Sequence, residues 1–151
     1  MSENTKKKDA FYFSHDSNAR LDEKMLQMRS AYGAEGYGMY WMLIEKMRDT
    51  TNYKLSIKGK YSNQAMASDL QVEPVKLKSF IEECINEFKL FQTDGKLIWS
   101  ESLLRRMSLM EEKSSKARQS AMARWNKNEE SSSIDANAMR THNDGIATKE
   151  N

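Results

Sequence analysis

The chain contains 151 residues, of which 38% are hydrophobic and 30% charged, and its net charge is +2. This length allows one domain of ordinary size with an unstructured tail and excludes a large multidomain protein. No apolar run approaches a membrane span, and the N-terminus lacks the apolar segment of a signal peptide, so we expect a cytosolic protein without membrane contact. The chain has a single cysteine, Cys84, and two histidines, which are too few to complete a zinc cluster. We expect no metal and no cofactor.

The residues that can build a core are concentrated before residue 110. Thirteen of the fourteen aromatic residues lie between Phe11 and Trp99, and only Trp125 lies beyond them. Serine, asparagine and charged residues dominate the C-terminal end, which is typical of disordered segments. The sequence therefore predicts a polar lead-in over 1–10, a folded domain over 11–110, a basic helical extension over 111–127 and a disordered polar tail over 128–151.

Two helices are predicted in the first third of the chain. The apolar run "FYFSH" comes first, as an edge strand or an extended segment laid on the core. Asp22 and Glu23 then open a helix that Gly33 can end. The helix after Gly33 carries the richest apolar stripe of the chain and should lie at the centre of the core; the stripe consists of Tyr37, Tyr40, Trp41, Ile44 and Met47.

A helix pair is predicted after a connection that contains a short strand around residues 54–57. Ser62 or Asn63 caps a short helix over Gln64–Leu70. Residues 71–73 form the break, and Pro74 suits the first turn of the next helix, because its missing N–H has no partner there anyway. The second helix, Pro74–Phe88, carries a continuous apolar stripe.

A β-hairpin is predicted next, over Lys89–Ser100. "KLFQ" and "KLIWS" flank "TDG", and an Asp-Gly pair between apolar runs favours a tight hairpin turn. A helix follows, whose first turns offer Leu103, Leu104, Met107 and Met110 to the core. A helix, a short helix, a turn, a longer helix and a hairpin are the order of a winged helix-turn-helix. We therefore predict a mainly helical α+β fold with a β-hairpin wing and a C-terminal basic helix.

The charges on this helix pair leave its function open. Lys76 and Lys78 lie at the N-terminal end of the second helix, where DNA contacts are usually made. Glu82, Glu83 and Glu87 lie further along, where carboxylates facing phosphates are unfavourable. A helix pair followed by a hairpin also builds small protein-docking modules, so the pattern alone leaves DNA binding and protein docking open.

The segment after the hairpin is basic. Residues 101–127 contain seven basic and three acidic side chains. This segment could neutralise phosphates, with Trp125 available to stack or wedge. Alternatively, it is a solvated extension or pairs with a second copy of the chain.

Nothing in the sequence points to an enzyme. The glycines of "YGAEGYG" match neither G-x-G-x-x-G nor a P-loop, and no Lys-Ser/Thr follows them. His15 and Asp16 are adjacent but have no plausible nucleophile or metal partner nearby in the sequence. We expect no catalytic residues.

The segments "FYFSHDSNARLDEKMLQMRSAYGAEGYGMYWMLIEKMRD", "KLIWSESLLRRM" and "KSSKARQSAMARW" resemble the N-terminal domain of phage replisome organisers of Gram-positive bacteria and their prophages, which are linked to DnaD-type primosomal proteins. The resemblance covers about Phe11 to Trp125 and is most distinctive at "YGAEGYGMYW". It implies a winged-helix domain in the bacterial cytoplasm that binds double-stranded origin DNA and helps helicase-loading or other replication proteins assemble. Longer members carry a second helical domain where this chain has a polar tail. The resemblance therefore implies an origin-binding or regulatory domain, which acts as a homodimer or works with a separately encoded partner.

The function predicted from these observations is that of a non-enzymatic DNA-binding protein of phage or prophage replication. A transcriptional repressor with the same fold and a protein-interaction adaptor of the replication machinery that does not touch DNA are the alternatives. Charge and placement, rather than a family motif, select the candidate DNA contacts. These are Gln64, Lys76, Lys78, Ser79, Lys96, Arg105, Arg106, Lys113, Lys116, Arg118, Arg124 and Lys127.

Overall fold

The computed structural model describes the backbone of residues 11–147 and the side chains of residues 11–132. The chain divides into two compact units, Met1–Ser108 and Leu109–Asn151. The predicted lead-in over 1–10 and the last residues of the predicted tail lie outside the described residues.

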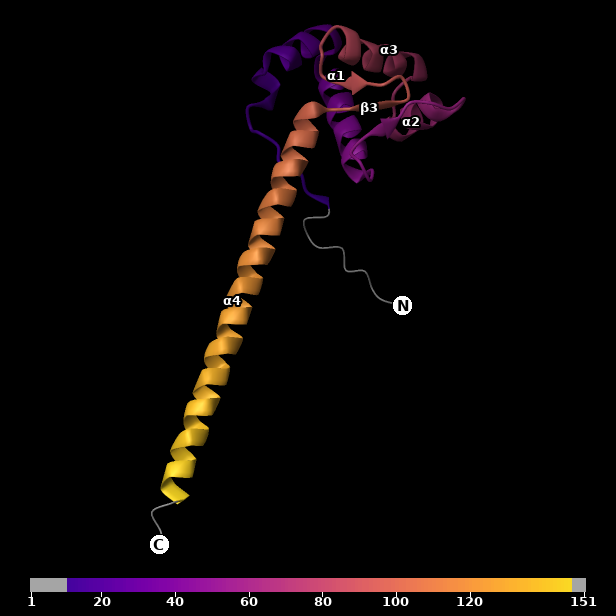
Figure 1. The fold of residues 1–151 in the computed structure, drawn as a ribbon. Helices are drawn as coiled ribbons and strands as arrows, with labels where there is room; N and C mark the ends of the chain where they lie inside the picture. Colours follow the sequence, from indigo (N-terminus) through magenta and orange to yellow (C-terminus); the bar gives the residue numbers. More distant parts are fainter. Residues whose placement is uncertain (1–10, 148–151) are drawn as a thin grey trace. The chain divides into compact units, whose positions relative to one another are not determined.

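The first unit follows the order of a winged-helix fold (Figure 1). Its elements are η2 (Ala19–Leu21), α1 (Glu23–Asp49), β1 (Leu55–Ser56), α2 (Ser62–Leu70), α3 (Pro74–Asn86), β2 (Gln92–Thr93), β3 (Leu97–Trp99) and the first turns of α4 (Glu101–Ala147). The three strands form one antiparallel sheet in the order β1-β3-β2. Leu55 pairs with Ile98 on one side of β3, and Thr93 pairs with Ile98 on the other. The structure thus confirms the mainly helical α+β, winged-helix-like fold.

Helix α1 is broken at Gly33, as the sequence predicts. Gly33 has φ +66° and ψ −153°, a left-handed conformation that glycine adopts without steric cost. Beyond the break, Gly36 is buried against α3. A β-carbon there would lie 2.4 Å from Cβ of Tyr32 and 3.5 Å from the ring of Phe80, whereas one on Gly38 would meet nothing within 4 Å. Because the other tight contact is with the Met28 sulfur at 2.9 Å, Gly36 lets the two segments of α1 pack closely across the break at Gly33, with Phe80 of α3 in ordinary van der Waals contact, and Gly38 does not contribute to this packing.

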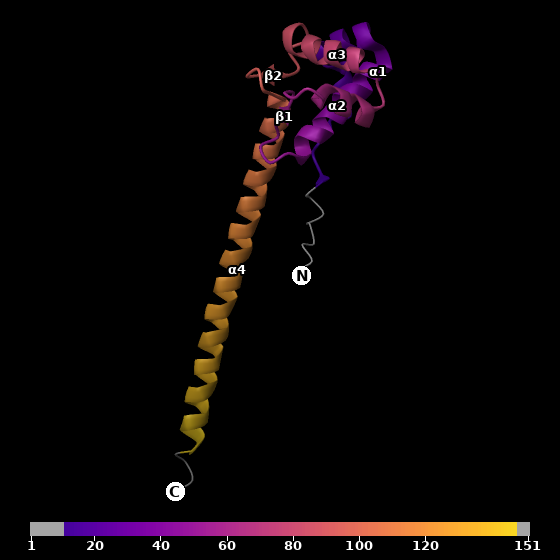
Figure 2. The ribbon, with the colours of Figure 1, turned by 90° about the vertical axis from the view of Figure 1, so that its right-hand side faces the viewer.

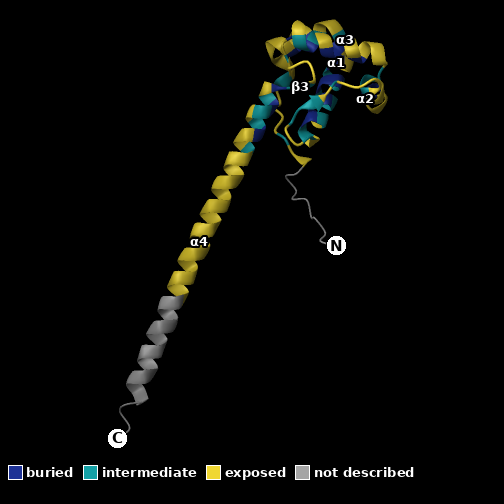
Figure 3. Ribbon diagram, turned by 45° about the vertical axis from the view of Figure 1, so that its right-hand side comes forward, coloured by how far each residue is buried: buried dark blue, intermediate teal, exposed yellow. Residues whose placement is uncertain are grey.

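The core lies between α1, α2, α3, the hairpin β2–β3 and the first turns of α4 (Figures 2 and 3). The ring of Phe80 from α3 is fully buried and meets Tyr32 of α1 edge-on at 5.1 Å. Phe91, which precedes β2, stacks on Tyr40 of α1 at 5.5 Å. The apolar stripe predicted for this part of α1 is only partly confirmed, because two of its residues, Tyr37 and Trp41, are only half-buried. The most buried residues of this part of α1 are Met39, Leu43, Ile44 and Met47.

The N-terminal segment is extended on the core rather than a strand. Phe13 stacks on Trp41 with ring centroids 6.0 Å apart, and His15 lies 4.1 Å from the same indole. Within the described residues, this segment does not pair with the sheet, which consists of β1, β3 and β2. Of the two alternatives that the sequence leaves open, the extended segment is therefore the one observed.

Three boundaries differ from the prediction. Helix α2 begins at Ser62, which places Tyr61 at the N-cap without a side-chain capping bond. Helix α3 ends at Asn86 instead of Phe88. Strand β2 begins at Gln92, because Phe88 and Phe91 are drawn into the core and the chain between them does not extend along the sheet.

Helix α4 continues through residues that the sequence predicts to be a disordered tail. Its backbone is helical to Ala147, well beyond residue 128. The chain has no proline after Pro74 and no glycine between Gly95 and Gly145, so no strong helix breaker interrupts this stretch. Composition alone, which favours disorder here, does not capture this continuity. Every residue from 111 to 132 is exposed, as the weak apolar face of this half predicts (Figure 3).

Candidate nucleic-acid interface

The helix pair α2–α3 is joined by a short, well-bonded turn. Gln71 adopts a left-handed conformation at the C-cap of α2 (φ 58°, ψ 43°), and the Val72 amide donates to the Ala67 carbonyl at 3.0 Å. The Asn63 side-chain amide donates to the Pro74 carbonyl at 2.8 Å. The first bond closes the C-terminal end of α2, and the second joins the N-terminal ends of the two helices.

The four candidate contacts on the helix pair are all exposed, namely Gln64, Lys76, Lys78 and Ser79. They differ in how free their charges are. The Lys76 ammonium binds Glu35 of α1 at 3.0 Å. Lys78 makes no ion pair within the described part of the chain. The tip of α3 therefore offers one uncommitted positive charge.

Acidic residues outnumber basic ones on the helix pair. Residues 62–88 contain five acidic side chains and two lysines. Glu82 and Glu87 are exposed on the C-terminal half of α3 and its end. Glu83 lies near Tyr32 of α1 and, together with burial, which is the larger effect, raises the pKa of that phenol to about 12. The helix that would enter a DNA groove is thus predominantly negative.

The hairpin turn presents Lys96 to solvent. The Asp94 carboxylate accepts hydrogen bonds from the backbone amides of Lys96 and Leu97, each at 2.8 Å. These bonds stabilise the charged form and lower the pKa of Asp94. Thr93 also bonds the turn, donating from its hydroxyl to the Leu97 carbonyl at 2.8 Å. Lys96 therefore projects from a well-defined turn.

Three further lysines lie near the hairpin and are not among the DNA contacts predicted from the sequence. Lys54 lies with its ammonium 4.2 Å from the centre of the Trp99 ring, a cation–π contact. Lys58 and Lys60 are exposed in the loop between β1 and α2. The sequence motif "KLSIKGK" contains all three, but only the pairing of β1 with β3 brings this motif to the hairpin.

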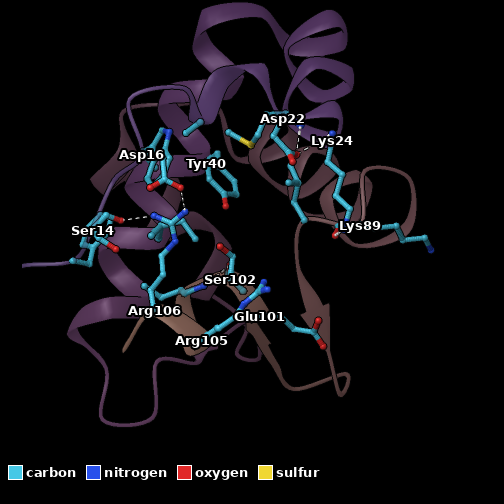
Figure 4. Close-up of a pocket in the computed structure, with 18 of the residues that line it drawn as sticks. Ser14, Asp16, Asp22, Lys24, Tyr40, Lys89, Glu101, Ser102, Arg105 and Arg106 are labelled. Carbon is cyan, nitrogen blue, oxygen red and sulfur yellow. Dashed lines mark hydrogen bonds and ion pairs between the residues drawn. The ribbon is translucent and has the colours of Figure 1, made fainter. Parts of the chain in front are cut away.

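Arg105 and Arg106 occupy different environments at the start of α4. Arg105 is exposed, whereas Arg106 is partly buried and binds the N-terminal segment. Its guanidinium donates to the Ser14 carbonyl at 2.7 Å and to the Asp16 carboxylate at 2.6 Å (Figure 4). Arg106 thus fastens the N-terminal segment to α4, and its charge is largely committed.

These residues border a cavity of about 490 Å³ (Figure 4). Tyr40 points into it, and burial raises the pKa of this phenol to about 12, opposed by a hydrogen bond with Ser100. The rim mixes both signs of charge, with Lys24, Lys89 and Arg105 facing Asp22 and Glu101. Among the described side chains, no group of three or more His, Cys, Asp or Glu could hold a metal ion.

The exposed part of α4 carries the remaining candidates. Lys113, Lys116, Arg124 and Lys127 recur at intervals that return to one side of an α-helix of 3.6 residues per turn. We call them the basic stripe. Lys116 is paired with Glu112 at 3.3 Å. Arg118 lies on the opposite side and donates to the Ser114 hydroxyl at 3.2 Å.

Trp125 lies outside the basic stripe. Its indole is 66% exposed, and Nε1 donates to the Glu129 carboxylate at 2.9 Å.

The order of helices and strands defines a small winged-helix-like domain, and the basic residues of α4 define a basic helical extension. The chain belongs to the Lin1244/Lin1753-like, N-terminal family of proteins from Gram-positive bacteria and phages, whose family model matches residues 12–103. This match does not bear on the DnaD relation, which stays a prediction. Neither the curated proteins nor the solved structures contain a match to the chain. No helix among the described residues has the length and apolar character required to cross a membrane.

Proposed function

We propose that this protein is a non-enzymatic, double-stranded DNA-binding protein of phage or prophage replication. The observation that carries the proposal is the winged-helix order of the first unit. It places an exposed helix pair and a lysine-bearing hairpin on one small domain. Such domains dock a helix, a hairpin or both on duplex DNA.

Two further observations support this proposal. The family contains proteins of Gram-positive bacteria and phages, which fits a prophage role. The basic stripe on α4 adds positive charges on one side of an exposed helix, a pattern that neutralises phosphates. Replication proteins that load the helicase are the proposed protein partners.

Binding of the full chain to three labelled duplexes tests the proposal. The duplexes are a phage origin, a phage promoter and a random sequence of equal length. We expect binding to all three at low salt, and the tightest binding to the origin. A preference for the promoter would indicate a repressor. No binding at low salt would contradict the proposal.

A protein-interaction adaptor is the second candidate, because the α2–α3 surface is predominantly acidic. An acidic helix suits a basic protein surface better than phosphates. An adaptor would bind a purified replication protein at the same salt concentrations at which it leaves DNA free. This result would replace the DNA-binding proposal.

A further inference from the structure

We propose that the DNA phosphates are bound by the loop between β1 and α2 together with the hairpin turn, rather than by helix α3. The surface consists of Lys58, Lys60 and Lys96, which we call the lysine edge. This inference rests on the proposed DNA-binding function and specifies how the domain would lie on the duplex.

The sheet brings the three lysines to one end of the domain. Ser56 of β1 pairs with Leu97 of β3, and the Ile57 amide donates to the Lys96 carbonyl at 3.0 Å. Lys58 follows Ile57 directly, so the loop leaves the sheet beside the hairpin turn. Residues that are almost forty positions apart in the sequence therefore form one surface.

The lysine edge rests on a locally constrained backbone. Gly59 has φ +122°, a conformation that favours glycine, and the Ser62 amide donates to its carbonyl at 3.2 Å. On the hairpin side, the Gly95 amide donates to the Thr93 hydroxyl at 3.0 Å. Both backbone segments are therefore held before any ligand binds, which lowers the entropic cost of binding.

The charges of the lysine edge are uncommitted. Lys58, Lys60 and Lys96 are exposed and make no ion pair within the described residues. Lys60 lies over the ring of Tyr61 at 5.3 Å, a contact that leaves its positive charge in place. Lys76 of α3, in contrast, is already bound to Glu35. Phosphates would meet three free ammonium groups at the lysine edge, but only one, that of Lys78, beside the partly neutralised Lys76 at the tip of α3.

The charge balance points the same way. Residues 54–61 contain three lysines and no acidic residue, and the hairpin turn adds Lys96 beside Asp94. The α2–α3 pair contains more carboxylates than lysines. Like charges repel, so a docking pose with Glu82 and Glu87 of α3 against the backbone is disfavoured. A pose on the lysine edge avoids this repulsion.

Tyr61 adds a second feature to the surface. Its ring is 64% exposed at the N-cap of α2, directly after Lys60. This exposed ring beside Lys60 adds an apolar contact surface next to the ammonium groups that would bind phosphates. This combination is absent from the exposed face of α3, which has no aromatic residue there.

Two double variants of the full chain test the inference. Lys58→Gln/Lys60→Gln removes two charges from the lysine edge, and Lys76→Gln/Lys78→Gln removes two charges from α3. The second variant is matched to the first in residue type and net charge. Affinity for one labelled duplex is measured at about 50 mM and about 200 mM salt, and circular dichroism checks that both variants are folded. Each phosphate contact contributes about 0.9 to the slope of log affinity against log salt concentration.

We expect the edge variant to lose affinity at low salt. We also expect the ratio between its two affinities to shrink about tenfold relative to the unmodified chain, because two contacts are lost. The α3 variant should keep the affinity of the unmodified chain at low salt and the same ratio between its two affinities. An edge variant that binds like the unmodified chain, or an α3 variant that loses as much, overturns the inference while leaving DNA binding intact. An unmodified chain that fails to bind contradicts the proposed function and this inference together.

Discussion

Lys76 of α3 and Glu35 of α1 form an ion pair with 3.0 Å between Nζ and Oε2, and their side chains remain 43% and 49% exposed. The contact ties the tip of α3 to α1 and offsets one of the two lysine charges of the helix. It therefore affects both the packing of the helix pair and its suitability for DNA.

The Lys76–Glu35 pair should contribute little to stability. Exposed ion pairs are typically worth below about 1 kcal/mol, because solvent screens them and their long side chains lose freedom. We expect a double-mutant cycle with Lys76→Gln and Glu35→Gln, followed by urea unfolding, to give a coupling energy below about 1 kcal/mol. A coupling of several kcal/mol would show that Lys76 is a structural residue and unsuitable for the matched α3 control.

Gly36 and Gly38 should respond oppositely to alanine. Gly36→Ala places a β-carbon against Tyr32 and Met28, and such overpacking lowers the free energy of unfolding by about 1–3 kcal/mol. Gly38→Ala has open space, and we expect it to raise stability by about 0.5–1 kcal/mol through helix propensity. Thermal unfolding of both variants measures this. Equal changes in the two variants would contradict the tight packing of Gly36 against Tyr32 and Met28.

The Asp94 turn should weaken in acid. Hydrogen bonds from Leu97 and Lys96 lower the pKa of Asp94 below its ordinary value of 3.8. A lowered pKa in the folded state means that the charged carboxylate stabilises the fold above pH 3.8 and that this contribution is lost as the pH falls through the folded-state pKa. The stability advantage over Asp94→Asn should therefore shrink only below pH 3.8. Carboxyl titration by NMR checks the pKa, and a value at or above 3.8 would contradict these bonds.

Basic residues of α4 should contribute to DNA binding only on the side of the helix that carries the basic stripe. Arg124 lies in the stripe, whereas Arg118 lies on the opposite side of the helix. We expect Arg124→Gln to weaken DNA binding severalfold and to lower its salt dependence, and Arg118→Gln to change neither. Each variant loses one positive charge relative to the unmodified chain, so electrophoretic mobility shifts compare them directly. Equal losses would indicate non-specific attraction to the whole helix.

Most of the fold follows from local signals in the sequence. Gly33 predicts the break in α1, Pro74 the start of α3, and Asp94-Gly95 the hairpin turn, and each is found in the structure. These signals act within a few residues of where they stand. The predicted start of β2 is wrong, because the burial of Phe91 against Tyr40 depends on a partner far away in the chain.

The candidate site is harder to predict from the sequence than the fold. The pairing of Lys76 with Glu35, the pairing of Arg106 with Asp16 and the position of Lys58 beside Lys96 all join residues distant in the chain. Charge counting cannot distinguish a committed lysine from a free one. Strand pairing and side-chain geometry supply this distinction, which is why the sequence prediction includes Lys96 but not Lys58 and Lys60.

The most direct test of the account is the salt dependence of duplex binding by the full chain, measured by fluorescence anisotropy from low to physiological salt. Several phosphate contacts predict a straight line of log affinity against log salt concentration, with a slope of about −0.9 for each contact. We expect a slope of about −2.7 or steeper, since the lysine edge alone offers three contacts. A flat line, or no binding at low salt, would contradict a DNA-binding function.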